Sequence, residues 1–500
     1  MESGTERKRR MSDFRRVLLS KDVLVIAFGA MIGWGWVVST GNWIESGGVL
    51  GAALGFVIGG IMIFFVGLTY AELTSAMPLA GGEHVFSHRA MGPYGSFVCT
   101  WAIILGYVSV ICFEACSLPT IIAYIFPDFL QCYLYTVAGF DIYLTWLATA
   151  IIFSAFITYI NVRGIQMAAA FQKFMTIIIM LVGVLIIVSG VVCGDVSNLD
   201  GQMFIGDDTG TMAKAVLTVA LITPFFFIGF DVIPQAAEEI KIPMKKVGRI
   251  LLTSVLFAIA FYSLIIVAVG LILDSSGIAS SISGSGLVTA DALAKAFNSD
   301  ILAKVVIIGG LCGIITSWNA FMIGGSRAMY SMAKTYMIPP VFGKIHKKYH
   351  TPVNALYMIG FISMLAPFLG RKILVWIVDA GNMGCCLAYL FVAVSFLILR
   401  KTQPDMPRPF KVRPYKAVGA IAILMSGFMV LMYLLPGSGS TLANVELAIV
   451  GAWFIMGLIF LLHSRHRYGT DFGRFDEVIE HSPEGETNDM QNSKNMENLQ

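Results

Sequence analysis

Long apolar runs constrain this chain more than any other feature. About twelve segments hold roughly 20 mostly apolar residues each, the length that a helix needs to cross a bilayer. Only 13% of the residues are charged, against about 25% in soluble domains. No segment shows the sustained alternation of a membrane barrel strand, so we expect helices and no strands. The predicted spans are 22–44, 49–74, 94–124, 142–161, 166–192, 213–236, 247–273, 300–331, 353–370, 373–399, 416–435 and 444–463.

The positions of Lys and Arg predict the orientation of these helices. With the N-terminus in the cytoplasm, 28 of the 34 Lys and Arg residues fall in cytoplasmic segments, as the positive-inside rule requires. We therefore expect an all-α, multi-pass protein of the plasma membrane with both termini in the cytoplasm. Residues 1–21 form a basic cytoplasmic segment, and residues 468–500 form a polar tail that is expected to be disordered.

Two of the predicted spans contain residues that interrupt a helix. The first reads FGAMIGWGWVVSTG (28–41), and the sixth reads TPFFFIGFDVIP (223–234). Glycine lets the backbone unwind and approach a ligand, and proline removes a backbone donor and kinks the helix. We expect both spans to be broken. The alternative is that the glycines serve close packing and the prolines make ordinary kinks.

The spacing of these two breaks predicts an internal repeat. Because five helices separate them, two five-helix units would lie in opposite orientations, as in transporters whose substrate binds between broken helices. The units would be 22–192 and 213–399, with 416–463 forming two further helices. Half-helix N-termini attract an anion and freed carbonyls attract a cation, so the pair suits a zwitterionic amino acid.

Several motifs resemble those of the amino acid–polyamine–organocation superfamily of transporters. The segments that carry the resemblance lie between about residues 20 and 415 and occur in the family's order. They are GAMIGWG (29–35), YAELTSAMPLAGGEHVFSHRAMG (70–92), FFFIGFDVIPQAAEEIKIP (225–243), WNAFMIGGSRAMYSMAKTYMIPPVFGKIHKKYHTPVNAL (318–356) and LRKTQPDMPRPFKVRP (399–414). The resemblance implies a leucine-transporter-type fold of about 12 transmembrane helices, with a 5+5 inverted repeat and two peripheral helices.

The resemblance also implies a substrate site at the two breaks. Backbone amides of the first break would bind the substrate carboxylate, carbonyls of the sixth-helix break would bind its ammonium group, and Phe225 would occlude it. The chain departs from the family pattern at Trp34, where a small hydroxyl residue is usual, and at His84, where tyrosine is usual. The substrate-binding candidates are Met31, Ile32, Gly33, Trp34, Gly35, Phe225, Phe226, Phe227, Ile228 and Gly229.

Ionisable residues within the spans are candidates for coupling transport to an ion. A charge in a membrane is costly unless it is paired or hydrated, so its presence there indicates a function. Glu114 in the third span would take up a proton or meet a substrate cation, or else be a structural carboxylate. Asp231 belongs to the family's sixth-helix pattern. Lys173 is expected to extend to the cytoplasmic surface, and the lysine that some proton-coupled relatives carry on the fifth helix is replaced here by Ile179.

A sodium site is the other candidate for coupling. The resemblance implies that Thr316 and Ser317 would supply hydroxyls and that Gly29, Ile32 and Gly313 would supply carbonyls, an oxygen set that suits a hard cation. Alternatively, the two hydroxyls bond their own helix. No cofactor or other metal is expected, and the coupling ion is left open between Na⁺ and H⁺.

The function that follows is secondary active transport of amino acids by symport or exchange. The chain lacks the HExxH, GxSxG and GxxxxGK[ST] motifs, so neither an enzyme nor an ATP-driven pump is expected. The expected partners are a small-molecule substrate and the lipid bilayer, without nucleic acid. The alternatives are a permease for an amine or another organocation, and, in other functional classes, a sensor with a transporter fold or a channel.

Overall fold

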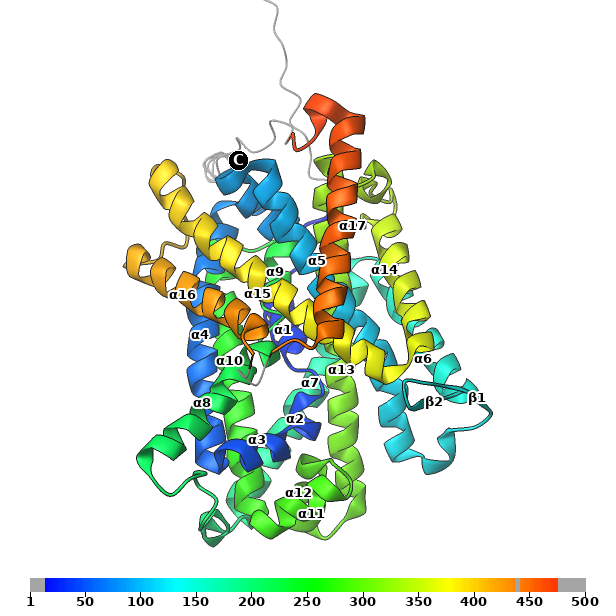
Figure 1. Cartoon of the computed structure of the whole chain (residues 1–500), viewed down its shortest axis with the longest axis vertical. Coiled ribbons are helices and arrows are strands. Elements are labelled where there is room, and N and C mark those ends of the chain that lie inside the picture. Colours follow the sequence, from blue (N-terminus) through cyan, green and yellow to red (C-terminus); the bar gives the residue numbers. More distant parts are fainter. Residues whose placement is uncertain (1–13, 437–440, 475–500) are drawn as a thin grey trace, which may run out of the picture.

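The chain folds into a bundle of long helices that are connected mostly by short segments (Figure 1). A computed structural model describes residues 14–436 and 441–474. In these residues ten helical segments are long and apolar enough to cross a membrane, so the expected multi-pass, all-α membrane architecture is confirmed. The long helices are α4 (Val49–Ala76), α5 (Glu83–Ile125), α6 (Leu144–Val162), α7 (Ile165–Cys193), α8 (Thr209–Phe226), α10 (Met244–Ile272), α13 (Asp300–Lys334), α15 (Gly370–Thr402), α16 (Tyr415–Leu434) and α17 (Asn444–Tyr468).

The structure has ten candidate membrane-spanning segments in its described residues, whereas about twelve were predicted, and the difference has two causes. The first predicted span is divided into α1 (Ser20–Met31), α2 (Gly35–Val38) and α3 (Thr40–Gly47), none of which is long enough to cross a membrane alone. The ninth and tenth predicted spans, α14 (Val353–Leu365) and α15, follow each other so closely that they form one apolar stretch of 50 residues. The count of twelve stays a prediction.

Short elements fill the connections and include a feature that the sequence analysis missed. Strands β1 (Tyr133–Val137) and β2 (Phe140–Tyr143) form an antiparallel hairpin, so the expectation of no strands is wrong here. The turn residues Ala138 and Gly139 both have positive φ, 50° and 81°, as in tight two-residue hairpin turns. The other short elements are η1 (Pro127–Phe129), η2 (Val196–Leu199), α9 (Val232–Gln235), η3 (Ala237–Glu239), α11 (Ser275–Ser283), α12 (Val288–Phe297), η4 (Pro340–Gly343), η5 (Ala366–Leu369) and η6 (Gly469–Asp471).

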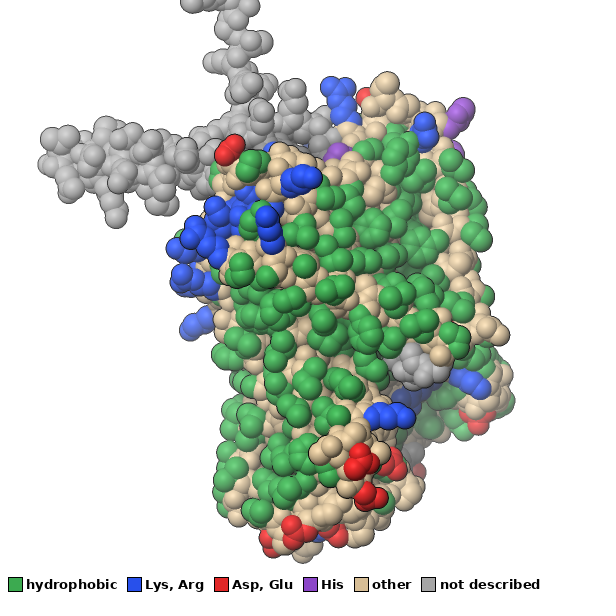
Figure 2. Space-filling model, turned by 60° about the vertical axis from the view of Figure 1, so that its left-hand side comes forward, with side chains coloured by type: hydrophobic (Ala, Val, Ile, Leu, Met, Phe, Trp, Pro, Cys, Tyr) green, Lys and Arg blue, Asp and Glu red, His purple; other side chains and the backbone are tan. Residues whose placement is uncertain are grey.

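Charged side chains are divided between the two ends of the bundle. Figure 2 shows a broad apolar band, with most of the visible Lys and Arg at one end and most of the visible Asp and Glu at the other. At the acidic end Asp208 caps α8, and hydrogen bonds from Thr211 and Gly210 hold the pKa of its carboxyl below the ordinary value. This distribution agrees with the charge bias in the sequence.

The chain that precedes α1 is held against the segment that follows α9. The backbone N–H groups of Val17 and Leu18 both donate to the carbonyl of Glu239 at 2.9 Å, and the N–H of Lys241 donates to Leu18 at 2.9 Å. We call residues 14–19 the N-terminal strap. Most of the predicted basic segment, residues 1–13, and most of the predicted disordered tail, residues 475–500, lie outside the described residues.

Candidate substrate and coupling site

The two predicted helix breaks are confirmed, and they touch each other. Helix α1 ends at Met31 before α2 begins at Gly35, and α8 ends at Phe226 before α9 begins at Val232. Gly229 in the second break has φ +133°, and a Cβ atom there would lie 2.7 Å from the carbonyl carbon of Ala30. This contact between two backbones requires glycine.

The first break presents backbone donors. Among the hydrogen bonds described for residues 14–436 and 441–474, none uses the N–H groups of Trp34 or Gly35, whereas the N–H of Gly33 is directed at the Tyr262 hydroxyl. These amides precede or begin the short helix α2, and free N–H groups at a helix start attract an anion. The Met31 carbonyl accepts a hydrogen bond from the buried hydroxyl of Tyr262 at 2.9 Å.

The second break presents backbone acceptors. The carbonyls of Phe226, Phe227 and Ile228 accept no hydrogen bond among those described for the same residues. A buried carbonyl without a donor is costly, so these oxygens are available to an ammonium group or a cation. The two breaks thus place free donors and free acceptors on neighbouring segments.

Asp231 fixes the shape of the second break. Its carboxylate accepts hydrogen bonds from the N–H of Gly229 at 2.8 Å and from the hydroxyls of Tyr107 at 2.5 Å and Tyr389 at 3.0 Å. Because Tyr107 lies on α5 and Tyr389 on α15, the carboxylate joins three parts of the bundle. The structure therefore places Asp231 in a polar network behind the break.

Glu114 lies against the first break. Its Oε1 atom accepts a hydrogen bond from the Ser317 hydroxyl at 2.5 Å and lies 3.7 Å from where a Cβ on Gly33 would be. The side chain is buried, and Oε2 has no hydrogen-bond partner among the described residues. The structure brings together Glu114, Ser317 and Gly33, which the sequence analysis named separately.

The predicted sodium ligands are close neighbours, but their hydroxyls already have partners. Thr316 donates to Gly313 of its own helix at 2.9 Å, and Ser317 donates to Ile314 at 3.0 Å as well as to Glu114. A Cβ on Gly313 would lie 2.9 Å from the carbonyl oxygen of Ile32. The bonds within the helix match the alternative interpretation of these hydroxyls, and the sodium site stays a prediction.

A chain of buried amides beside Gly29 was missed in the sequence. The Asn161 amide donates to Asn319 Oδ1 at 2.9 Å, and the Asn319 amide donates to Gln172 Oε1 at 2.7 Å. Gln172 Nε2 lies 2.7 Å from where a Cβ on Gly29 would be, as does the Thr176 hydroxyl. Three amide side chains within apolar runs were the signal that could have revealed this network, because polar groups in a membrane interior need partners.

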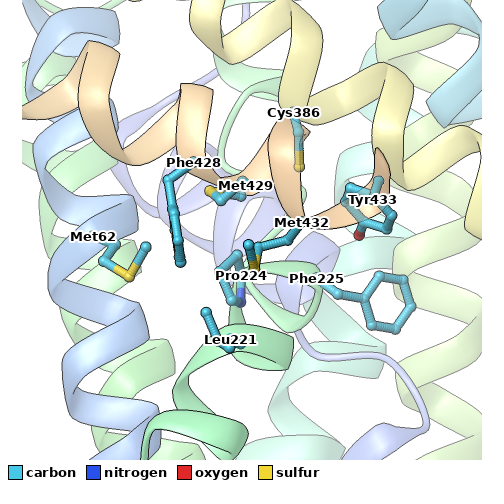
Figure 3. Close-up of a pocket in the computed structure, with 9 residues that line it drawn as sticks. All are labelled: Met62, Leu221, Pro224, Phe225, Cys386, Phe428, Met429, Met432 and Tyr433. Carbon is cyan, nitrogen blue, oxygen red and sulfur yellow. The ribbon is translucent and has the colours of Figure 1, made fainter. Parts of the chain in front are cut away.

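Aromatic side chains surround the breaks. The Phe226 ring lies 2.5 Å from where a Cβ on Gly35 would be, and its centroid is 4.8 Å from that of Trp43. The Trp34 indole packs against Gly310 of α13, which explains how the bulky residue is accommodated. Phe225 lines a pocket with Met62 of α4 and with side chains of α8, α15 and α16 (Figure 3). Its role in occluding the substrate stays a prediction.

Outside the breaks, Lys173 is placed as expected for a lysine near the membrane surface. Its Nζ atom lies 3.3 Å from Asp22 Oδ1 at the start of α1, and the lysine side chain is 45% exposed. His84, which replaces the family's tyrosine, is buried and lies 3.0 Å from the hydroxyls of both Thr100 and Thr335. His84 thus contributes to packing at the start of α5.

Comparison with known proteins shows the family to which the chain belongs. The chain is similar along nearly its full length to three transporters of Bacillus subtilis (strain 168). The branched-chain amino acid permease BcaP is 27% identical, with 90% of this chain and 93% of the relative covered. A methylthioribose transporter is 24% identical (90% and 94%), and an aspartate-proton symporter is 23% identical (91% and 85%). Residues 20–462 match the model of the family described as amino acid permease, and the chain therefore belongs to the amino acid permease family.

Proposed function

We propose that this protein is a secondary transporter that carries a free amino acid across the plasma membrane by alternating access. One observation carries the proposal: free backbone N–H groups of Trp34 and Gly35 and free carbonyls at 226–228 lie on two helix breaks that touch. The substrate carboxylate binds the first set and its ammonium group binds the second. The amino acids in the names of two relatives support this substrate class.

The wider architecture of the proposal follows from the sequence. Residues 22–192 and 213–399 form two inverted repeats that move against each other around the site, as is usual for transporters with paired broken helices. The basic end of the molecule lies in the cytoplasm, together with both termini. Asp231 holds the second break in shape, and Phe225 covers the substrate.

Protons are the coupling ion that the site supports best. Glu114 is a buried carboxyl without a salt bridge to a Lys or Arg among the described residues. An ionised carboxylate at this position would repel the substrate carboxylate at Gly33, because two like charges a few ångströms apart in a low-dielectric interior interact strongly. Protonation of Glu114 removes this repulsion, so substrate and proton bind together. A relative named as a proton symporter supports this choice.

The same carboxyl favours a second candidate function, transport of an amine or another organocation. An ionised Glu114 would attract a substrate cation, and a substrate without a carboxylate would leave the N–H groups of Trp34 and Gly35 unused. The two functions predict different substrates, and the difference is directly measurable.

Uptake by purified protein in liposomes tests the proposed function. We expect accumulation of at least one labelled amino acid when the outside is acidic, and we expect the same uptake when choline replaces sodium. A panel of unlabelled amino acids and their decarboxylated amines should show competition by the amino acids alone. Uptake of an amine without uptake or exchange of any amino acid would instead establish the second candidate.

Replacing Glu114 with glutamine tests the coupling. Glutamine has almost the same shape but cannot release or bind a proton at physiological pH, so we expect uphill uptake driven by a proton gradient to fall at least tenfold. The pH dependence of the remaining uptake should flatten. The control is Glu45→Gln, the same change at an exposed position of α3, and it should keep both the rate and the pH profile. A Glu114→Gln variant with an unaltered pH profile would exclude this residue as the proton site.

A further inference from the structure

Four carboxyl groups of the described residues are at most 1% exposed, and they fall into two sets according to their partners. Glu72 and Glu239 are buried but paired with arginines, at 2.6 Å from Arg400 and 2.8 Å from Arg327. Glu83 and Asp231 are fully buried, and neither belongs to a salt bridge within residues 14–436 and 441–474. An unpaired charge in a low-dielectric interior is costly, so the second set requires another explanation.

Glu83 and Asp231 belong to one polar cluster. Glu83 begins α5 and accepts a hydrogen bond from the Gln235 side chain of α9, the helix that starts directly after Asp231. The Gly81 N–H donates to the Gln235 carbonyl at 3.1 Å, which holds the start of α5 against α9. The cluster therefore spans from the second helix break to the loop before α5, on the side that we assign to the cytoplasm.

Tyr70 of α4 packs beside the residues around Asp231 and interacts electrostatically with both carboxyls. Its ring centroid is 5.8 Å from that of Tyr389, whose hydroxyl bonds Asp231, and its hydroxyl lies beside Glu83. The Oε1 atoms of Glu83 and Gln235 are buried without a hydrogen-bond partner among the described residues. A tyrosine hydroxyl both donates and accepts a proton, so Tyr70 is a suitable group to pass one.

Within the described part of the chain, no Lys or Arg forms a salt bridge with Glu83. The nearby buried arginines are occupied by Glu72 and Glu239, and the ring nitrogens of the neighbouring His84 are within hydrogen-bond distance of hydroxyls of Ser96, Thr100 and Thr335. The other titratable groups that interact electrostatically with Glu83 are acidic or neutral, and they lie on α4, α5, α15 and the segment between α8 and α9. They are Tyr70, Cys99, Tyr107, Cys385, Tyr389 and Asp231. Two carboxyls in such surroundings are not both ionised, because the second charge would meet both burial and repulsion by the first.

We propose that Glu83 is a second proton-binding carboxyl, which exchanges a proton with Asp231 by way of Tyr70 and so connects the helix break with the cytoplasmic side. The inference rests on the proposed proton-coupled transport. Glu114 binds the proton together with the substrate, whereas Glu83 and Asp231 provide the step by which a proton leaves toward the cytoplasm. Because Glu83 lies away from the free groups of the two breaks, it acts on coupling and does not bind the amino acid.

Glu83→Gln separates this role from substrate binding. We expect proton-driven accumulation in liposomes to fall at least tenfold, and the alkalinisation of the outside medium that accompanies uptake to disappear with it. Exchange of labelled for unlabelled amino acid, which moves no net proton, should fall less than threefold. Glu83→Asp keeps a titratable group and should recover most of the accumulation, whereas the exposed control Glu45→Gln should behave as the unmodified protein.

The outcomes distinguish this inference from the proposed function. If the unmodified protein neither accumulates nor exchanges an amino acid, the proposed function fails. The role of Glu83 is refuted if the unmodified protein moves protons with the amino acid and Glu83→Gln retains both accumulation and proton movement. It is also refuted if accumulation and exchange by the variant fall equally. Transport by the unmodified protein without proton movement refutes it as well. Should Glu83→Gln not yield folded protein, Tyr70→Phe takes its place, with the same expected loss of accumulation relative to exchange and the same refuting results.

Discussion

Transport falls by about a hundredfold when Gly229 is replaced by alanine, the loss expected when a binding group is displaced by about 1 Å. At φ +133° a side chain is strained, and its Cβ would lie 2.7 Å from both the carbonyl carbon and the Cβ of Ala30. Neither of these atoms can rotate away, so the two breaks must separate. The free donors at 34–35 and the free acceptors at 226–228 then no longer fit one substrate. The measurement is the initial rate of labelled amino acid uptake in liposomes.

Gly427→Ala is the matched control. Gly427 lies in the interior of α16, and a Cβ there would meet only Leu390 within 4 Å, at an ordinary contact distance of 3.9 Å. Alanine is the better helix former, so this variant should transport at the normal rate and unfold no more easily. If Gly229→Ala transported as well as Gly427→Ala, the close approach of the two breaks would not be required for function.

Arg327→Met lowers the free energy of unfolding by about 3–5 kcal/mol, the cost of leaving one buried charge without its partner. Arg327 and Glu239 are each only 1% exposed, and their Nη2 and Oε1 atoms are 2.8 Å apart. Burial raises the pKa of Glu239 and Arg327 opposes that rise. Without the arginine, the folded protein holds a proton on Glu239 to higher pH. The stability deficit should therefore be smallest in acid and grow as the pH rises. Chemical unfolding in mixed micelles at several pH values measures it.

Two further variants test this explanation. Arg327→Met combined with Glu239→Leu removes both charges, so most of the lost stability should return. Lys295→Met breaks the exposed pair with Asp274, whose side chains are 54% and 47% exposed and whose atoms are 3.5 Å apart, and it should cost less than about 1 kcal/mol. A double variant that is no more stable than Arg327→Met would show that the arginine acts through its packing and not through its charge.

The parts of this fold that the sequence predicts are those that depend on local chemistry. The spanning helices follow from the apolar runs, and the breaks follow from Gly29, Gly33 and Gly35 in one span and Pro224 and Gly229 in the other. In each case the residues that cause the feature lie within a few positions of it. The turn at 138–139 is also local, but strands of four and five residues are too short to show the sustained alternation of a strand that crosses a membrane.

The contacts that complete the site join residues far apart in the chain, and the sequence does not predict them. Ser317 is 203 residues from Glu114, and Tyr389 is 158 residues from Asp231. The fit of Trp34 depends on the absence of a side chain at Gly310. The sequence around Gly310 gives no sign of this contact. The unpaired state of Glu83 is not predictable for a related reason: the sequence reveals a carboxylate but not whether an arginine lies beside it.

The N-terminal strap constrains how this part of the chain can evolve. Its hydrogen bonds to Glu239 and Lys241 are made by backbone atoms, so the exposed side chains of Arg15 and Leu19 can change while the attachment persists. Length is a different matter, because one residue inserted within the strap would move its backbone donors and acceptors out of register with residues 239–241. Among related sequences we would therefore expect varied residues in the strap but a fixed number of them before the first helix.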